Sequence, residues 1–138
     1  MSNLSNNYIA GDWVKGASSI SNINPSNTND VIGEFAQANN SQLEDALNSA
    51  QVAQRQWAAT GLEQRQAVLM KIGEEMMARS AELGELLSRE EGKPVVEGKG
   101  EVYRAGQFFT YYAAEVLRQG GDTADSVRPN IEIDVRRE

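Results

Sequence analysis

The residues that most often carry enzymatic chemistry are missing from this sequence. Its 138 residues include no cysteine and no histidine. A thiolate nucleophile, a serine–histidine pair and a zinc site with nitrogen or sulfur ligands are therefore excluded within the chain. Only carboxylates, lysines and tyrosines remain for proton transfer. Hydrolase or metalloenzyme chemistry would need a second chain.

Two charged strings resemble parts of binding sites. Residues 89–94 (REEGKP) are the most distinctive string, but a helix end, a glycine cap and a proline start explain it adequately. Residues 98–100 (GKG) suggest a phosphate loop. They lack the spacing of such a loop and no strand precedes them, so we reject a phosphate site there.

Arg104 and the aromatic residues that follow it form a third candidate. An arginine on a helix is usually solvated or ion-paired, but its planar fork of donors also suits a carboxylate clamp at a channel mouth. Phe108, Phe109, Tyr111 and Tyr112 lie at helical spacing. Core packing is the default interpretation for these aromatic residues, and a substrate channel is the alternative.

The composition limits the class of partner. The net charge is -7, from 13 basic and 20 acidic residues. Because the only basic cluster is Arg136-Arg137, we expect neither nucleic-acid binding nor an anionic membrane surface as partner. No signal peptide and no apolar run of about 20 residues is present. We expect a cytoplasmic protein with one domain of ordinary size.

Short strands are expected in parts of residues 8–38 and 131–137. Residues 8–10 and 13–14 flank Gly11-Asp12, which predicts a hairpin turn with glycine first. The first seven residues are polar and expected to be loose. Residues 131–135 (IEIDV) alternate apolar and acidic side chains, a strand pattern. Neither the N-terminal hairpin nor the C-terminal strand has an evident sheet to join. We therefore expect the chain to be a piece of a larger protein or one half of an assembly.

Three helices are expected between residues 41 and 92. Capping boxes at Ser41 with Glu44 and at Thr60 with Glu63 predict the first two starts, and Ser80 is expected to cap the third. Gly92 is expected to end the third helix in the left-handed conformation.

A fourth helix is expected from near Pro94 to near Leu117. Six residues fall on one helical face: Val102, Ala105, Phe109, Tyr112, Ala113 and Val116. Three glycines would weaken this helix by about 1 kcal/mol each, which suggests close backbone packing at Gly98, Gly100 and Gly106.

The order of these parts resembles the aldehyde dehydrogenase superfamily. The resemblance rests on a series of short motifs across nearly the whole chain: residues 8–14 (YIAGDWV), 24–26 (NPS), 32–33 (IG), an alanine-rich helix ending at Trp57, Arg65, residues 90–94 (EEGKP) and 111–113 (YYA). Residues 101–105 (EVYRA) and 125–129 (DSVRP) are most similar to 2-oxoglutarate semialdehyde dehydrogenases.

The resemblance implies an α/β fold of which this segment alone is α+β. The hairpin and the four helices, residues 1–128, would belong to an incomplete Rossmann-type cofactor domain. Residues 129–138 would begin the oligomerisation sheet, in an intact enzyme that is a homodimer or homotetramer. The family usually continues beyond a position such as Glu138, so the chain is expected to be cut there.

The chemistry implied by the resemblance uses a cysteine thiolate, a nicotinamide cofactor (NAD or NADP) and a water-activating glutamate. In the family these parts lie beyond the end of this chain, so no residue here is assigned a catalytic or cofactor-binding role. The fragment alone is expected to be inactive and to bind no cofactor. The intact enzyme would oxidise an aldehyde to a carboxylic acid, with 2-oxoglutarate semialdehyde as the candidate substrate.

Two smaller roles follow from the resemblance. A structural monovalent cation would be bound by the backbone carbonyl of Ile23 and an oxygen of Glu90, and Arg104 would line the substrate entrance. Two other interpretations stay open from the residues alone. The chain could be a free-standing helical module that pairs its terminal strand with a partner chain, or a helical adaptor with no ligand.

Overall fold

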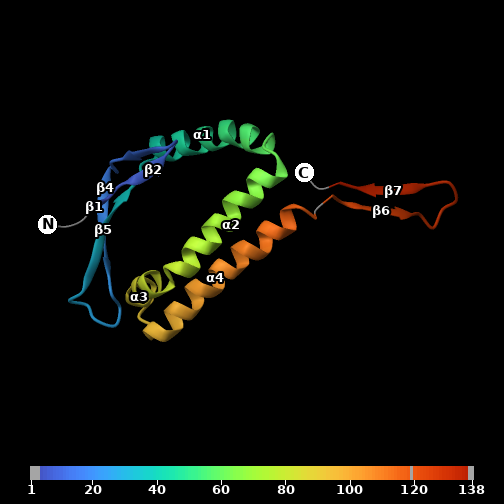
Figure 1. Ribbon diagram of the computed structural model, residues 1–138. Helices are drawn as coiled ribbons and strands as arrows, with labels where there is room; N and C mark the ends of the chain where they lie inside the picture. The colour runs from blue at the N-terminus through green and yellow to red at the C-terminus, as the bar shows by residue number, and fades with distance from the viewer. Residues whose placement is uncertain (1–3, 119, 137–138) are drawn as a thin grey trace.

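The computed structural model describes residues 4–118 and 120–136, which form small sheets, four helices and a terminal hairpin (Figure 1). Figure 1 shows the N-terminal strands on one side, α1 across one end of the molecule, and α2 and α4 side by side. In chain order the elements are β1 (Leu4–Ser5), β2 (Asn7–Ile9), β3 (Asp12–Val14), β4 (Ser18–Ile23), β5 (Val31–Gln37), α1 (Asn40–Ala58), α2 (Leu62–Ala78), α3 (Ser80–Glu91), α4 (Val95–Val116), β6 (Asp122–Asp125) and β7 (Glu132–Val135).

The N-terminal strands form a three-stranded sheet and a separate hairpin. In the sheet β5 lies between β1, which is parallel to it, and β4, which is antiparallel. The predicted loose start was wrong for Leu4, Ser5 and Asn7, which lie in strands, while residues 1–3 lie outside the described residues. Main-chain pairing orders this mostly polar segment: Leu4 and Ser5 pair with β5, and Asn7 pairs with Val14 of β3.

The hairpin turn lies one residue earlier than predicted. Ala10 and Gly11 connect β2 to β3, and both have positive φ, 55° and 95°. Two such residues match the twist of the flanking strands. Asp12 is instead the first residue of β3, so the prediction of a Gly11-Asp12 turn was wrong.

The start of α1 is capped by Asn39 and not by Ser41. The Asn39 side chain accepts a hydrogen bond from the Gln42 backbone at 2.9 Å, and the Gln42 side chain accepts one from the Asn39 backbone at 3.1 Å. The predicted capping-box geometry is therefore present two residues earlier. Gln42 also donates to the Lys15 carbonyl at 2.7 Å, which ties the start of α1 to the end of β3.

The corner between α1 and α2 is closed by Arg65. Its guanidinium donates to the Ala58 carbonyl at 2.5 Å and to the Thr60 hydroxyl at 3.2 Å, and that hydroxyl donates to the Trp57 carbonyl at 2.7 Å. Thr60 thus completes the end of α1, and Gly61 precedes α2 without a side-chain cap. The predicted Thr60 capping box was wrong.

The third helix begins at Ser80, but the capping position is Arg79, whose side chain binds Glu82 at 2.7 Å. The prediction of a Ser80 cap was therefore wrong by one residue. Gly92 ends α3 with a φ of 76°, as predicted. Pro94 occupies the capping position of α4, one residue before the helix itself.

Glycine residues let α2 and α3 pack closely against α4. A Cβ atom on Gly106 would lie 2.8 Å from the Gly73 carbonyl oxygen, and one on Gly84 would lie 2.5 Å from the Lys99 Cα. Gly98 is likewise buried against Gly84, whereas Gly100 has open space around it. The predicted close packing is confirmed at Gly98 and Gly106 and was wrong at Gly100.

The apolar face predicted for α4 is covered only in part. Val102 and Ala113 are buried, while Tyr112 is 56% exposed. The total accessible surface is 10597 Å², whereas a folded monomer of 15.1 kDa exposes about 7,100 Å². No residue of α1 is buried. The described elements therefore leave about 3,500 Å² more surface uncovered than is usual for a domain of this mass.

The terminal strand β7 has a partner within the chain. It pairs antiparallel with β6, and the resulting hairpin extends away from the helices (Figure 1). The expectation that this strand lacks a sheet partner was wrong, because β6 has the polar sequence DTAD and carries no apolar alternation. None of the described helices combines the length and apolar character needed to cross a membrane.

The glycine contacts predict opposite effects for two alanine substitutions in α4. Gly106→Ala should lower the free energy of unfolding by about 1–3 kcal/mol, because the new methyl group overlaps the backbone of α2. Gly100→Ala should raise it by up to about 1 kcal/mol, because alanine favours the helix and meets no neighbour. Urea unfolding of the two variants measures both changes. Changes of equal sign would contradict the packing described here.

Candidate functional site

The turn between β4 and β5 is joined to the end of α3 by an ion pair. Arg89 donates two hydrogen bonds to the Asp30 carboxylate, at 2.7 and 3.0 Å, and Asn24 donates a third at 3.1 Å. These donors, Arg89 first, hold the pKa of Asp30 at about 2, below the ordinary value of 3.8. Asp30 was not recognised from the sequence because its partner lies 59 residues away.

The next residue of α3 contacts the same turn. Asn22 donates a hydrogen bond at 2.9 Å to Glu90, and the pairing of β4 with β5 is irregular between Asn22 and Ile23. Glu90 therefore lies beside the strand end that carries Ile23, its predicted partner in cation binding. Among residues 4–118 and 120–136, no three acidic residues cluster as a metal site. The ligand roles of Ile23 and Glu90 stay predictions.

Two of the sequence motifs, residues 24–26 and residues 90–94, lie in direct contact. The Ser26 hydroxyl donates to the Gly92 carbonyl at 2.9 Å. A Cβ atom on Gly92 would lie 2.7 Å from the Ser26 hydroxyl and 2.9 Å from Pro25 Cγ. Gly92 is therefore required both for its left-handed conformation and for this close approach.

Lys93 connects the α3–α4 junction to the first turns of α4. Its ammonium forms ion pairs with Glu91 and with Glu101, the latter at 2.6 Å, and its side chain is only 17% exposed. The hydrogen bonds to Glu101 and Glu91, the former being the larger cause, raise the pKa of Lys93. This pairing was not recognisable from the sequence, because it crosses the start of a helix.

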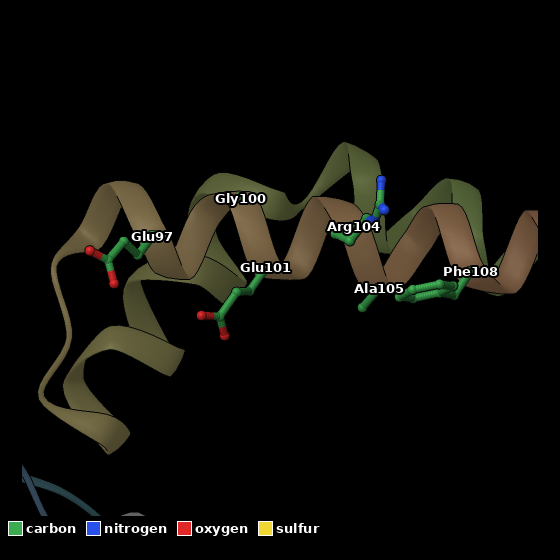
Figure 2. Close-up of a pocket in the computed structure, with 6 residues that line it drawn as sticks. All are labelled: Glu97, Gly100, Glu101, Arg104, Ala105 and Phe108. Atoms are coloured by element: carbon green, nitrogen blue, oxygen red, sulfur yellow. The ribbon is translucent and has the colours of Figure 1, made fainter.

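The outer face of α4 carries a shallow groove around Arg104. The groove has a volume of about 540 Å³ and is lined by Glu97, Gly100, Glu101, Arg104, Ala105 and Phe108 (Figure 2). The Arg104 guanidinium carbon lies 5.4 Å from the centre of the Phe108 ring, a cation–π contact. Arg104 has no hydrogen bond or ion pair with any residue that the structure describes.

A second hollow continues from Arg104 and Phe108 towards the C-terminal end of α4. It has a volume of about 340 Å³ and also contacts Tyr111 and Tyr112, whose rings meet edge to face at 5.3 Å. These aromatic side chains are largely exposed, so the default expectation that they pack in a core was wrong for Phe108, Tyr111 and Tyr112. The spacing of four residues between Arg104 and Phe108 was the signal available in the sequence.

The sequence profile of the aldehyde dehydrogenase family matches residues 13–138. The chain belongs to the aldehyde dehydrogenase family. The resemblance noted from the motifs is thereby confirmed. Members of this family are oxidoreductases, and the chain is similar to members whose names or structures include a nicotinamide cofactor.

Named relatives agree with the finer resemblance. The chain is 31% identical over its whole length to an alpha-ketoglutarate semialdehyde dehydrogenase of Haloferax volcanii, covering 29% of that protein. It is 33% identical over 87% of its length to an alpha-ketoglutaric semialdehyde dehydrogenase of Bacillus subtilis, covering 25% of it. The solved structure of an NAD-dependent benzaldehyde dehydrogenase from Corynebacterium glutamicum matches 96% of the chain and 29% of its own, with a TM-score of 0.81 and 30% identity.

The chain thus spans less than a third of the length of these relatives. Residues 98–100 lie inside α4. Arg104 lies in a groove, but its role at a substrate entrance stays a prediction.

The ion pair of Asp30 predicts a specific pH dependence. Its pKa is lowered in the folded state, so its stabilising effect is complete above about pH 4 and disappears as the pH falls to about 2. Asp30→Asn should therefore lower the urea midpoint at pH 7, and its deficit should shrink between pH 4 and pH 2. Asp12→Asn, at an exposed carboxylate of β3, serves as the control. A deficit that is constant over this range would contradict the pairing.

Proposed function

We propose that this chain forms the N-terminal part of an aldehyde dehydrogenase that oxidises the semialdehyde of a dicarboxylic acid. The candidate reaction converts 2-oxoglutarate semialdehyde to 2-oxoglutarate with NAD or NADP. The observation that carries the proposal is Arg104, whose guanidinium lies in a groove, contacts the Phe108 ring and has no ion pair among the described residues.

The chemistry of the groove suits a carboxylate. Such a substrate bears a negative charge at the end remote from its aldehyde, and a guanidinium fork can bind that charge through two parallel hydrogen bonds. Phe108 contacts the guanidinium through its ring and has no hydrogen-bond acceptor, so the N–H donors of Arg104 stay available for a carboxylate. Ala105 and Phe108 supply apolar walls. The names of the Haloferax and Bacillus relatives specify a substrate of this class.

The role of this chain in the reaction would be to bind and orient the substrate. It has no cysteine and no histidine, so the nucleophile would come from outside these 138 residues. A bound nicotinamide accepts the hydride in this class of reaction. The described residues contain no strand, glycine-rich loop and helix unit that would fit its phosphates, so we assign no residue here to the cofactor.

The assembly belongs to the proposal as well. From the sequence, residues 1–128 would belong to the cofactor domain and residues 129–138 to an oligomerisation sheet. Because β6 (Asp122–Asp125) pairs with β7, we propose that the oligomerisation sheet begins at β6. The proposed enzyme is a cytoplasmic homodimer or homotetramer. The exposed edges of the β6–β7 hairpin also favour a second candidate function, a module that adds this hairpin to the sheet of a partner chain.

A monovalent cation is proposed at the end of β4. The Ile23 carbonyl and the Glu90 carboxylate would supply oxygen ligands, the donors that hard cations prefer. The hydrogen bond from Asn22 supports this proposal because it holds Glu90 next to Ile23. The cation would neutralise Glu90 and brace the contact between β4 and α3.

Replacement of Arg104 tests the proposed substrate class. In a chimeric enzyme, residues 1–138 of this chain replace the corresponding segment of the Bacillus subtilis relative, and Arg104→Ala is introduced into that chimera. A charge-assisted hydrogen bond is worth about 1.5–3 kcal/mol, so kcat/KM for 2-oxoglutarate semialdehyde should fall roughly ten- to a hundredfold. The value for a neutral aliphatic aldehyde should change far less.

Two controls accompany this measurement. The 138-residue chain alone should show no aldehyde oxidation with NAD or NADP, because it contains no thiol. Arg55→Ala removes an exposed arginine of α1 and should affect both aldehydes equally and weakly. Equal losses for the charged and the neutral aldehyde on Arg104→Ala would refute the carboxylate role.

The cation proposal predicts a salt-specific stability. Sodium or potassium chloride should raise the melting temperature of the chain above its value in choline chloride at the same ionic strength. Glu90→Gln should remove most of this difference, whereas Glu44→Gln, at an exposed carboxylate of α1, should not. Equal melting temperatures in the three salts would exclude the cation.

A further inference from the structure

Arg104 lacks the ion pair that its position on α4 would normally provide. Glu101 lies three residues before it, a spacing at which acidic and basic side chains of a helix are neighbours. The same molecule forms such pairs elsewhere: Arg118 binds Glu115 at the end of α4. That pair has the same order and spacing as Glu101 and Arg104, so its absence at Arg104 needs a local cause.

Glu101 is paired with Lys93 instead. The Lys93 ammonium lies 2.6 Å from the Glu101 carboxylate and also binds Glu91. Figure 2 shows Glu101 directed away from Arg104, towards the N-terminal end of α4. Lys93 is held there because Gly92, the residue before it, packs against Pro25 and Ser26.

The other neighbours of Arg104 on this face do not neutralise it. Glu97 lies seven residues before it, about 10 Å along the helix axis, and points away in Figure 2. Phe108, four residues after it, offers a ring face and no carboxylate. The positive charge of Arg104 therefore has no counter-ion among the described residues of the groove.

We propose that Lys93 is a positioning residue that holds Glu101 away from Arg104, so that a substrate carboxylate can become the counter-ion of Arg104. The inference rests on the proposed function of Arg104 and adds the contact that leaves its guanidinium free to bind a substrate carboxylate. Lys93 acts through Glu101 and touches no substrate. The Lys93–Glu101 pair thus sets specificity for a charged aldehyde from the rim of the groove.

Arginine-specific modification of the 138-residue chain tests the inference directly. Phenylglyoxal reacts more slowly with a guanidinium that is held in an ion pair, and peptide mapping by mass spectrometry gives a rate for each arginine. Lys93→Met should release Glu101 to pair with Arg104 and slow modification of Arg104 roughly twofold, the size of an exposed pair at this spacing. Lys93→Met with Glu101→Gln should restore the rate, and Lys93→Arg should leave it unchanged.

Internal controls come from the same digests. Arg55 has no partner among the described residues, and Arg79 is paired with Glu75 and Glu82. Phenylglyoxal should therefore modify Arg55 faster than Arg79, and both rates should be the same in every folded variant. If Lys93→Met unfolds the chain, the modification rate of Arg79 will approach that of Arg55. The single variant Glu101→Gln then tests the role of Lys93. An unchanged Arg104 rate in Glu101→Gln supports the inference, because Glu101 is already held by Lys93.

Two results would overturn the inference. One is faster modification of Arg104 in Glu101→Gln, which would mean that Glu101 already pairs with Arg104. The other is an unchanged Arg104 rate in a folded Lys93→Met variant. Both are independent of the aldehyde kinetics of Arg104→Ala. Failure of the proposed substrate class would therefore leave the reactivity pattern intact, and failure of the Lys93 role would leave the substrate preference intact.

Discussion

The bidentate ion pair between Arg89 and Asp30 is the contact on which the geometry of the candidate site depends. It joins the β4–β5 turn to the end of α3, and two parallel hydrogen bonds fix orientation as well as distance. Because α3 is held in this orientation, Glu90 meets Asn22, and Gly92 meets Ser26. The chain then leaves Gly92 in a fixed direction, so a contact in the strand layer determines where Lys93 lies and which carboxylate it binds.

The helix that carries Arg104, α4, packs against α2 and α3 with one face and carries the groove on the opposite face. Gly98, Val102 and Gly106 form the inner face, which packs against α2 and α3 with almost no space between the backbones. Arg104 lies two residues from both Val102 and Gly106, a rotation of about 200° about the helix axis from each, so it projects on the opposite face. The close inner contacts thus fix the orientation of the groove, although none of its polar residues takes part in them.

The repeating apolar pattern predicted four helices correctly because helical periodicity is a property of local sequence. The first residue of each helix was harder to predict. Asn39 and Ser41 are both good caps, and only the path of the preceding strand selects Asn39. The β6 strand carries no apolar alternation and is defined by its partner β7. The sequence pointed to Arg104, but it did not reveal the position of Lys93, which depends on packing between distant segments.

The strand layer, α1 and the paired helices α2 and α4 form the three sides of a triangle (Figure 1). Each corner is pinned by a few hydrogen bonds: Arg65 at the α1–α2 corner, Arg89 at the corner between α3 and the β4–β5 turn, and Gln42 at the start of α1. In mechanical terms the three sides form a triangular frame whose corners are joined by these contacts. Few side chains are buried inside this triangle, so its angles depend on these few hydrogen bonds. Loss of the contact at any one corner would let the sides rotate about the other two corners. Because α1 is about 28 Å long, a small rotation at one of its ends would shift the other end by a large distance.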